Sequence, residues 1–550
     1  MTHNFLKIHP NDNLLVALTD LEAGQQIKVN GKSLVIRKPV PAKHKFAATD
    51  LKSGDHVYMY GSLVGTVTED IPAGGLLTTE NTKHSASGFT GRTGEVSWQA
   101  PDVSKWRDRT FMGYHRKDGK VGTANNWLVI PLVFCENRNV NVIKNAFMQE
   151  LGYATTDVYR EYVSNLIEWY REGKIDQIRT QETPPRPAEF SRNEQLFKNV
   201  DGIRFLTHEG GCGGIRQDSE ALCALLAGYI CHPNVAGATV LSLGCQNAQI
   251  SLLQEKLDAI TPDPGKPIYI YEQQQSGTEF DMLTSAIRQT FLGLMEANKI
   301  ERKPAPLSHL VVGMECGGSD GFSGISANPS VGYAGDLITA LGGSVILSEF
   351  PELCGVEQEL INRTVDDQTA EKFMSLMSAY SKAAEDAGSG FDMNPSPGNI
   401  KDGLITDAMK SAGAAKKGGT SPVKAVLDYT EIVTEPGLNL LCTPGNDVES
   451  TTALAGSGAN IILFTTGLGT PTGNPVTPVV KVSSNTRLAQ RMPDIIDFDC
   501  GPVITGEKTI EQTGEEMFEY IIELASGNTV TKAQQLNQDD FIPWKRGVSL

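Results

Sequence analysis

The chain has 550 residues, which is the length of three or four domains at roughly 150 residues each. Asp and Glu (65) outnumber Lys and Arg (48), and the net charge of −17 argues against a nucleic-acid partner, which needs a basic surface. Hydrophobic residues make up 40% and charged residues 21%, which excludes a mainly disordered chain. The longest apolar runs, 127–135 and 221–231, are too short to span a membrane, so we expect no membrane partner.

The N-terminal segment predicts a small all-β module over residues 1–95. Short β-type runs are separated there by glycine-containing turns. The runs are Leu14–Leu18, Gln26–Val29, Leu34–Ile36, Val57–Tyr60 and Leu63–Val67. Residues 96–105, at the end of a Ser- and Gly-rich stretch, predict a linker.

Cysteine usage indicates the compartment. The nine cysteines include no CxxC pair, and Met1–Asp12 lacks the apolar core of a signal peptide. We therefore expect reduced thiols and a cytoplasmic location.

Residues 106–550 alternate strand and helix patterns, which is typical of α/β layers. We expect a middle domain over residues 106–262. Its segment 121–134 ends in an apolar run that is typical of a buried strand. The other candidates are helices at Asn141–Leu151 and Thr156–Glu172 and strands at Ile203–Thr207 and Ala238–Leu243. Pro262–Lys266 predicts a boundary. In the C-terminal domain, 263–550, the candidate strands are Ile268–Tyr271, Leu310–Met314, Ser344–Leu347, Leu438–Leu441 and Ile461–Phe464.

Polar, Gly-rich turns follow these strands, where open parallel sheets bind ligands. They are 207–214, 243–247, 314–329, 443–452 and 465–475. One such turn is ordinarily a sharp strand-to-helix connection, but five gathered at sheet edges favour a polyol or sugar-acid pocket. None matches a nucleotide-binding motif. GGSDG at 317–321 matches a hydrolase nucleophile string, but no His follows Ser319, so we interpret this match as chance.

Histidines and acids supply the candidate chemistry. No His lies beyond His309, so an imidazole base at the C-terminal sheet must come from another domain or subunit. His44, flanked by lysines on the β module, and His208, on a Gly-rich turn, are the candidates; a solvated basic loop is the alternative for His44. Acidic residues near strand ends suit a divalent cation, with an acidic surface as the alternative.

Three cysteines in Gly-flanked turns, Cys212, Cys245 and Cys316, could hold an iron–sulfur cluster with one open position. The alternative is that each is a small residue where nothing larger fits.

These segments together resemble the altronate dehydratase and galactarate dehydratase family of sugar-acid dehydratases. The matching strings run in family order: KIHPNDN (7–13), HKFAATDL (44–51), DGKVGTANN (118–126), THEGGC (207–212), HPNVAGATVLSLGC (232–245), ECGGSDGFSGISANP (315–329), NPSPGN (394–399), PGLNLLCTPGND (436–447), ALAGSGANIILFTTG (453–467) and DFDCG (497–501). The resemblance is closest to the altronate-dehydrating members, notably in NPSPGN, PGLNLL and RGVSL (546–550).

The resemblance implies a multidomain α/β chain. Its parts are an N-terminal β-clip (SAF-like) module, a middle dimerisation domain and a C-terminal Rossmann-like domain with a metal site. It also implies a homodimer and a divalent metal, Fe2+ or else Mn2+. The implied reaction is loss of water from a small-molecule sugar acid, D-altronate, to give 2-dehydro-3-deoxy-D-gluconate.

Four positions depart from the family pattern. The family often has Arg, Glu, Cys and Arg where this chain has Ala124, Gln246, Ala414 and Leu468. Two of these changes remove an Arg that could clamp a carboxylate. Either the substrate differs, or a lysine such as Lys410, Lys416 or Lys481 replaces the Arg. The alternatives are a dehydratase of another aldonate or of an aldarate such as galactarate, and a sugar-acid-binding paralogue without activity.

β-Elimination needs a base for the C2 proton, an acid for the departing C3 hydroxyl and a cation for the resulting charge. We expect His44 as base or acid, Lys45 on the substrate carboxylate, and His208 as a second acid or base. The expected metal ligands are Glu315, Asp320 and Glu349, with Cys316 if iron is bound. The expected substrate-binding residues are Ser319, Asn328, Asn446, Asp447, Thr465, Thr466 and Lys481.

Overall fold

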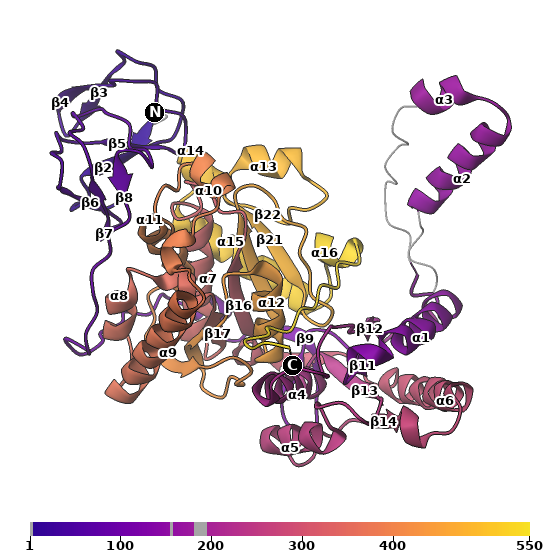
Figure 1. Cartoon of the computed structure of the whole chain (residues 1–550). Helices are drawn as coiled ribbons and strands as arrows, with labels where there is room; N and C mark the ends of the chain where they lie inside the picture. The colour runs from indigo at the N-terminus through magenta and orange to yellow at the C-terminus, as the bar shows by residue number, and fades with distance from the viewer. Residues whose placement is uncertain (1–3, 155–157, 181–194, 550) are drawn as a thin grey trace.

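The computed structural model describes residues 4–154, 158–180 and 195–549, arranged as an N-terminal β module and two α/β domains (Figure 1). The β module contains only antiparallel pairs, which confirms the all-β prediction. Its strands are β1 (Phe5–Leu6), β2 (Leu14–Ala17), β3 (Gln26–Val29), β4 (Lys32–Val35), β5 (Lys45–Ala47), β6 (His56–Met59), β7 (Ser62–Val67) and β8 (Thr82–Lys83). Strand β5 pairs with β2, which fixes Lys45 opposite Val16.

The middle domain is built on a parallel sheet with strand order β12-β11-β13-β14. The strands are β11 (Asn126–Pro131), β12 (Gly202–Phe205), β13 (Val235–Ser242) and β14 (Ile268–Glu272), with helices α1 (Asn137–Glu150), α4 (Arg216–Cys231), α5 (Ile250–Ile260) and α6 (Glu279–Ala297). The expected boundary at residue 262 therefore falls inside this domain. The turn at 262–266 joins α5 to β14 rather than joining two domains.

A small antiparallel sheet connects the two α/β domains. Its order is β10-β9-β15, with β9 (Thr110–His115), β10 (Val121–Gly122) and β15 (Lys303–Pro306). The chain passes from β15 into the C-terminal domain, whose first strand is β16 (Val311–Cys316).

The C-terminal domain carries a seven-stranded parallel sheet of order β18-β19-β17-β16-β20-β21-β22, as the parallel α/β prediction required. Its other strands are β17 (Ser344–Leu347), β18 (Val423–Leu427), β19 (Gly437–Leu441), β20 (Ile461–Thr466), β21 (Val479–Ser483) and β22 (Phe498–Asp499). The α-helices are α7 (Ala327–Ala340), α8 (Glu357–Asn362), α9 (Asp367–Asp386), α10 (Pro397–Lys401), α11 (Asp407–Ala414), α12 (Asp447–Gly456), α13 (Thr486–Arg491), α14 (Gly501–Thr505), α15 (Ile510–Ala525) and α16 (Lys532–Gln535). The chain continues from β16 toward β17 on one side and later returns to β20 on the other, so the carboxyl ends of β16 and β20 form the topological switch point.

The expected linker 96–105 is fastened to the C-terminal domain. Trp98 Nε1 donates to Thr420 Oγ1 at 3.1 Å. Just before it, the amide of Thr90 donates to Gln358 Oε1 at 2.8 Å. The linker is therefore held on the surface of the C-terminal domain by hydrogen bonds.

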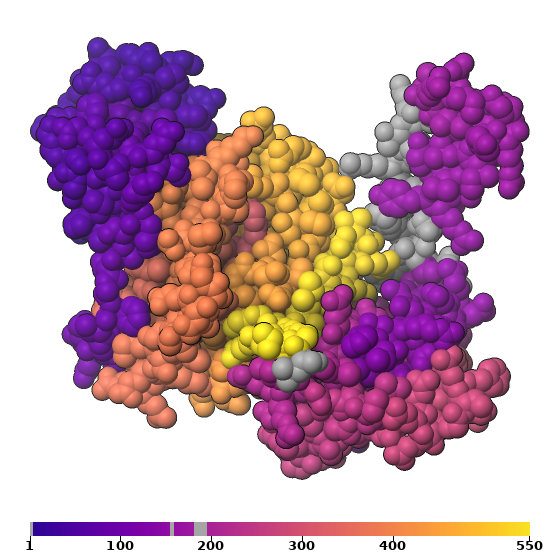
Figure 2. Space-filling view, viewed as in Figure 1, coloured from indigo at the N-terminus to yellow at the C-terminus, as the bar shows by residue number. Residues whose placement is uncertain are grey.

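Two helices of the middle domain, α2 (Val158–Arg171) and α3 (Ile175–Thr180), project from the body as a hairpin, which Figure 2 shows standing clear of the rest of the chain. Residues 156 and 157, the start of the predicted helix Thr156–Glu172, lie outside the described residues. None of the helices in the described ranges is long and apolar enough to cross a membrane.

Candidate functional site

A thiol and two carboxylates converge where β16 and β17 end. Cys316 is the last residue of β16, while Glu349 and Glu352 follow β17 around a short 3-10 turn, Phe350–Leu353. The Cys316 thiol lies 3.3 Å from Glu349 Oε2 and 3.1 Å from Glu352 Oε2. Their exposed fractions are 2%, 1% and 3%, so all three groups are buried at the carboxyl edge of the sheet.

The backbone of Glu349 is held in an unusual conformation that turns the chain at this edge. Its φ of 66° lies in the left-handed region, which costs a residue with a Cβ about 1–2 kcal/mol. The Glu349 amide donates to Thr443 Oγ1 at 2.8 Å, and the Cys316 amide donates to Glu349 Oε2 at 3.1 Å. These bonds fix the carboxylate beside the thiol.

Two buried lysines compensate the acids. Lys417 Nζ lies 2.9 Å from Glu349 Oε2, and Lys410 Nζ lies 2.5 Å from Glu352 Oε1. Burial and the charge of Glu352 raise the pKa of Glu349. Burial also acts to raise the pKa of Glu352, but the charges of Lys410 and Lys417 and the hydrogen bonds to this carboxylate together hold its pKa below the usual value. Glu352 is therefore the carboxylate of this cluster that burial leaves ionised.

Glu315 lies behind this group and is 0% exposed. Its Oε2 accepts hydrogen bonds from Ser348 Oγ at 2.8 Å and Ser450 Oγ at 2.5 Å. Burial, together with the charge of Glu349, raises the pKa of Glu315 well above its usual value. Oε1 of Glu315 and Oε1 of Glu349 receive no hydrogen bond from the described residues. A proton on Glu315 or a bound cation can satisfy these oxygens.

The donor set fits a divalent cation. One ligand atom each from Cys316, Glu349 and Glu352 lies within 4.8 Å of the other two. Thiolate and carboxylate donors suit Fe2+, and carboxylates also suit Mn2+. Of the predicted ligands, Cys316 and Glu349 belong to this set, Glu315 borders it, and Asp320 lies outside it.

Asp320 instead anchors the β module. Its buried carboxylate accepts hydrogen bonds from Ser323 Oγ at 2.9 Å and Ser484 Oγ at 2.8 Å. It also lies 3.0 Å from Lys43 Nζ, which forms a second ion pair with Asp402 at 2.7 Å. The turn that carries Lys43, His44 and Lys45 is thereby docked on the C-terminal domain.

His44 and Lys45 both lie at this contact. Lys45 is 1% exposed and donates to the carbonyl of Gly403 at 2.6 Å. Burial lowers its pKa to about 7, although Asp320 acts in the opposite direction. His44 Nδ1 lies 3.2 Å from the carbonyl oxygen of Ala42, to which it donates. The neutral ring then has its lone pair on Nε2, as a general base requires, and burial lowers its pKa.

The predicted hydroxyl-binding residues fall at the switch point, but several are already engaged. Thr465 Oγ1 donates to Asn328 Oδ1 at 2.7 Å. Thr466 Oγ1 accepts from the amide of Gly469 at 2.9 Å. Asn446 caps α12 by accepting from the amides of Val448 and Glu449. These side chains hold the turns in place.

Asp447, Ser319 and Lys481 differ in their surroundings. A Cβ on Gly317 would lie 2.1 Å from Asp447 Oδ2, so the missing side chain of Gly317 makes room for this carboxylate. Burial and the nearby charge of Glu349 raise the pKa of Asp447 to about 7. Ser319 is 5% exposed. Lys481 is 0% exposed and donates to the carbonyl of Thr472, within the C-terminal domain.

His208 lies in the middle domain, away from the cluster. Its Nε2 donates to the carbonyl of Pro131 at 2.7 Å, and its Nδ1 accepts from the amide of Gly210 at 3.1 Å. Burial lowers its pKa to about 4. Both ring nitrogens are engaged, so the imidazole is neutral and structural in this conformation. Cys212 and Cys245 are exposed, and neither belongs to a potential three-ligand metal group among the described residues.

Lys417 was not among the expected site residues, and Glu352 was a candidate only as one of the acidic residues near strand ends. Glu352 is separated from Glu349 by Phe350 and Pro351, and the string SEFPE after a strand is the signal that marks it. Lys417 follows α11 in an Ala-, Lys- and Gly-rich segment that reads as surface. Only the tertiary structure shows that its side chain is 1% exposed.

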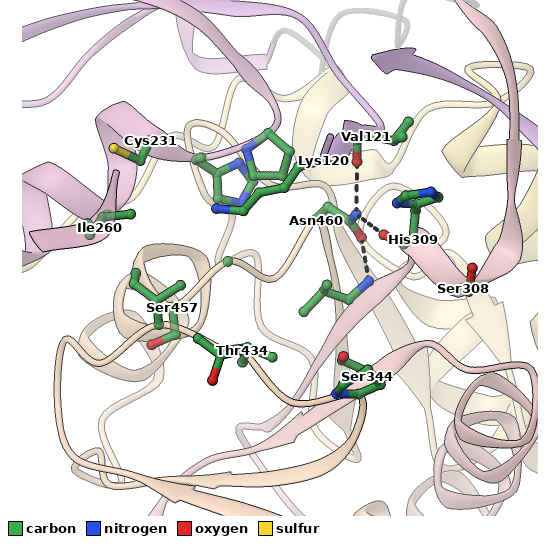
Figure 3. A pocket seen from close by; sticks show the side chains of 18 residues that line it. Lys120, Val121, Cys231, Ile260, Ser308, His309, Ser344, Thr434, Ser457 and Asn460 are labelled. Carbon is green, nitrogen blue, oxygen red and sulfur yellow. Dashed lines mark hydrogen bonds between the residues drawn. The ribbon is translucent and has the colours of Figure 1, made fainter. Parts of the chain in front are cut away.

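A cavity of about 170 Å³ lies at the opposite edge of the C-terminal sheet (Figure 3). Val311 and Ser344, the first residues of β16 and β17, help to line it. The Asn460 side chain joins its walls by donating to the carbonyl of His309 at 3.0 Å and accepting from the Val311 amide at 3.0 Å. None of the described residues that line this cavity is Asp or Glu, so it differs from the acidic site above.

Comparison with known proteins covers all three parts of the chain. Residues 3–85 match the altronate/galactarate dehydratase SAF domain, 113–298 the D-galactarate dehydratase/altronate hydrolase second domain, and 307–549 the D-galactarate/altronate dehydratase C-terminal domain. The chain is 33% identical to altronate dehydratase from Escherichia coli (strain K12) over 99% of this chain and 100% of the relative. It is 32% identical to altronate dehydratase from Bacillus subtilis (strain 168) over 100% of both chains. Galactarate dehydratase (L-threo-forming) from E. coli is 29% identical over 96% of this chain and 94% of the relative.

Proposed function

The chain belongs to the altronate and galactarate dehydratase family, a family of hydro-lyases, and we propose that it removes water from D-altronate. The product of this proposed reaction is 2-dehydro-3-deoxy-D-gluconate, and the cofactor is a divalent metal. The observation that carries the proposal is the buried Cys316–Glu349–Glu352 group at the carboxyl edge of the sheet. Full-length similarity to two altronate dehydratases favours the aldonate substrate.

We propose that Cys316, Glu349 and Glu352 hold the metal, with Fe2+ favoured because a thiolate is present. A bound divalent cation would stabilise the negative charge that develops beside the substrate carboxylate. Lys410 keeps the Glu352 carboxylate ionised, and Lys417 holds the Glu349 carboxylate in place before substrate arrives. An iron–sulfur cluster through Cys212, Cys245 and Cys316 has less support, because only Cys316 belongs to the buried group.

In this proposal, the β module supplies the proton transfers. His44 Nε2, the free nitrogen of the neutral ring, takes the C2 proton. Lys45, with a pKa of about 7, offers either an ammonium for the substrate carboxylate or a proton for the leaving C3 hydroxyl. Asp447, also with a pKa of about 7, is a second proton donor close to Gly317.

The test is anaerobic turnover of a panel of aldonates and aldarates with added Fe2+, read as formation of keto acid. Product from altronate supports the proposal. Product only from galactarate or another sugar acid would mean that the chain carries out the same dehydration on a different substrate, which agrees with its similarity to galactarate dehydratase. Metal binding and sugar-acid binding without product from any substrate would instead identify a binding paralogue.

We also propose a homodimer formed through the projecting hairpin. Tyr159, Val163, Ile167 and Tyr170 lie on one face of α2 and are 83%, 51%, 45% and 70% exposed. Such an apolar helical stripe is the kind of surface that a second copy covers. Light scattering of the wild type and of Val163→Glu/Ile167→Glu tests this, because a dimer that persists in the variant would exclude the hairpin.

We propose that the protein works in a reducing compartment such as the cytoplasm. All nine cysteines are free thiols, although two of them, Cys212 and Cys245, are exposed. Thiol titration of protein purified without reductant tests this, since a loss of free thiols would show that oxidation is tolerated.

A further inference from the structure

A second group of metal-ligating side chains lies where the β module meets the C-terminal domain. His84 follows β8, Cys354 follows the 3-10 turn after β17, and Asp407 is the first residue of α11. One ligand atom from each lies within 4.8 Å of the other two. None of these three residues has a part in the proposed dehydration, so their convergence needs its own explanation.

Asp407 is the most deeply buried member of this group. Its side chain is 1% exposed, yet Oδ2 has no hydrogen-bond partner among the described residues. The Cys354 thiol forms a side-chain hydrogen bond with this carboxylate, and Oδ1 has a further, long contact of 3.5 Å from Ser411 Oγ. Burial raises the pKa of Asp407 well above its usual value, and burial also raises that of the Cys354 thiol. A buried carboxylate oxygen without a partner is costly, and a bound cation would satisfy Oδ2.

We propose that His84, Cys354 and Asp407 form a structural site for a Zn2+-like divalent cation, separate from the site at Cys316. Imidazole, thiolate and carboxylate are the three zinc-ligand types found in proteins. In tetrahedral coordination, ligand atoms about 2.0–2.3 Å from the metal lie about 3.5 Å apart, so only small side-chain movements are needed. Binding releases the Cys354 thiol proton to solvent, and water fills the fourth position from the partly exposed side.

The His84 ring is already positioned for this role. Its Nδ1 accepts a long hydrogen bond, 3.3 Å, from the amide of Ala408, the residue after Asp407. The ring is therefore held against the first turn of α11. Coordination through Nδ1 would replace this weak bond with a metal–ligand bond.

The site would fasten the β module to the segment on which it sits. Thr406 Oγ1 donates to the carbonyl of Val64 at 2.7 Å, and Lys45 donates to the carbonyl of Gly403 at 2.6 Å. The cation would add a third link within residues 403–407. Because the same module carries His44, the link would hold that imidazole over the C-terminal domain.

Cobalt is the probe for this site, because a thiolate bound to Co2+ gives a charge-transfer absorption band. The Cys316→Ser variant of the full chain is stripped of metal and titrated with Co2+. This variant is used because the thiol of the other buried group then cannot contribute to the absorption band. We expect a band that saturates at one equivalent. Adding Cys354→Ser should abolish the band, and adding His84→Ala or Asp407→Asn should weaken Co2+ affinity at least tenfold. Adding Cys212→Ser, an exposed thiol outside both groups, should change nothing.

Absence of the band in Cys316→Ser, or its persistence after Cys354→Ser is added, would overturn the proposal. If Cys316→Ser does not fold, zinc content after dialysis against Zn2+ decides instead. Cys354→Ser should then hold one Zn2+ per chain fewer than wild type, and equal contents would refute the site. Neither readout depends on turnover, so failure of the proposed dehydration leaves this test intact.

Discussion

Lys417 Nζ and Glu349 Oε2 lie 2.9 Å apart, and each side chain is only 1% exposed. An ion pair so deeply buried is worth little net stability against an apolar replacement of both partners. Lys417 opposes the rise in the pKa of Glu349 that burial causes and fixes this carboxylate at the sheet edge, so the fold is sensitive to loss of either partner.

Removing only the cation should therefore be costly. Lys417→Met leaves the Glu349 carboxylate buried without its counter-charge, which destabilises a protein by about 3–5 kcal/mol. Urea denaturation should show a loss of that size. Lys416→Met is the matched control, because Lys416 is 33% exposed and 3.7 Å from Glu359, so its loss should cost less than about 1 kcal/mol. Equal stability of Lys417→Met and wild type would contradict the burial of the pair.

Metal removal should abolish turnover. Treatment with a chelator should end keto-acid formation, and Fe2+ or Mn2+ should restore it. Cys316→Ser should weaken Fe2+ affinity at least tenfold, measured by the Fe2+ concentration that half-restores activity, because a soft ligand is lost. Cys245→Ser is the control and should behave as wild type, since that thiol is exposed and outside the group.

His44→Ala should lower kcat by about 10²–10⁴-fold, the usual contribution of a general acid or base. The wild-type rate should rise with pH and level off near or below pH 6.5, because burial lowers the pKa of His44 and only the neutral ring accepts a proton. The variant should lose this rise. His56→Ala, an exposed histidine of the same module, is the control. Wild-type turnover by folded His44→Ala protein would remove His44 from catalysis.

Lys45 should make stability depend on pH above neutrality. Its pKa is about 7 in the folded chain and 10.5 when unfolded, so between these values the unfolded chain binds more protons. The free energy of unfolding contributed by Lys45 therefore increases from pH 7 to pH 10.5. In Lys45→Met this increase should disappear, so wild type should gain stability relative to the variant as the pH rises. A difference that stays constant with pH would show that Lys45 is charged when buried.

His208 should matter for stability and not for the chemical step. Its folded pKa of about 4 lies below the unfolded value of 6.5, so protonation favours the unfolded chain as the pH falls from 6.5 to 4. His208→Gln should flatten this loss of stability while leaving kcat per folded molecule unchanged. A selective fall in kcat without loss of stability would instead indicate that His208 is a catalytic residue.

The order of the α/β elements followed from the sequence because buried parallel strands are continuous apolar runs. Strands β16, β17, β19 and β20 lie where such runs predicted them. The domain boundary did not follow, because strand β14 is an equally apolar run and nothing local assigns it to one sheet or the other. Only its pairing with β13 places it in the middle domain.

The site was harder to predict, because local sequence does not show which distant segments come together. Strand ends pointed to Glu315, Cys316 and Glu349, since the carboxyl edge of a parallel sheet is a property of topology. The lysines that neutralise them come from a distant segment, and local sequence does not distinguish a buried ammonium group from an exposed one. His208 is an example of a residue that was predicted to be catalytic and is not placed for it. The prediction rested on its Gly-rich turn, but both nitrogens of its ring form hydrogen bonds with backbone groups.

The order in which the cluster's residues occur along the chain limits how the protein can be made. A ribosome synthesises Glu315, Glu349 and Glu352 before Lys410 and Lys417, and Ser450 after all of these. A nascent chain that stops short of residue 450 has the acids without their full set of partners, so the sheet edge cannot close over ionised carboxylates. In the proposed function, metal would therefore bind at this edge only after the C-terminal domain has been translated, and a truncated product would lack the complete site.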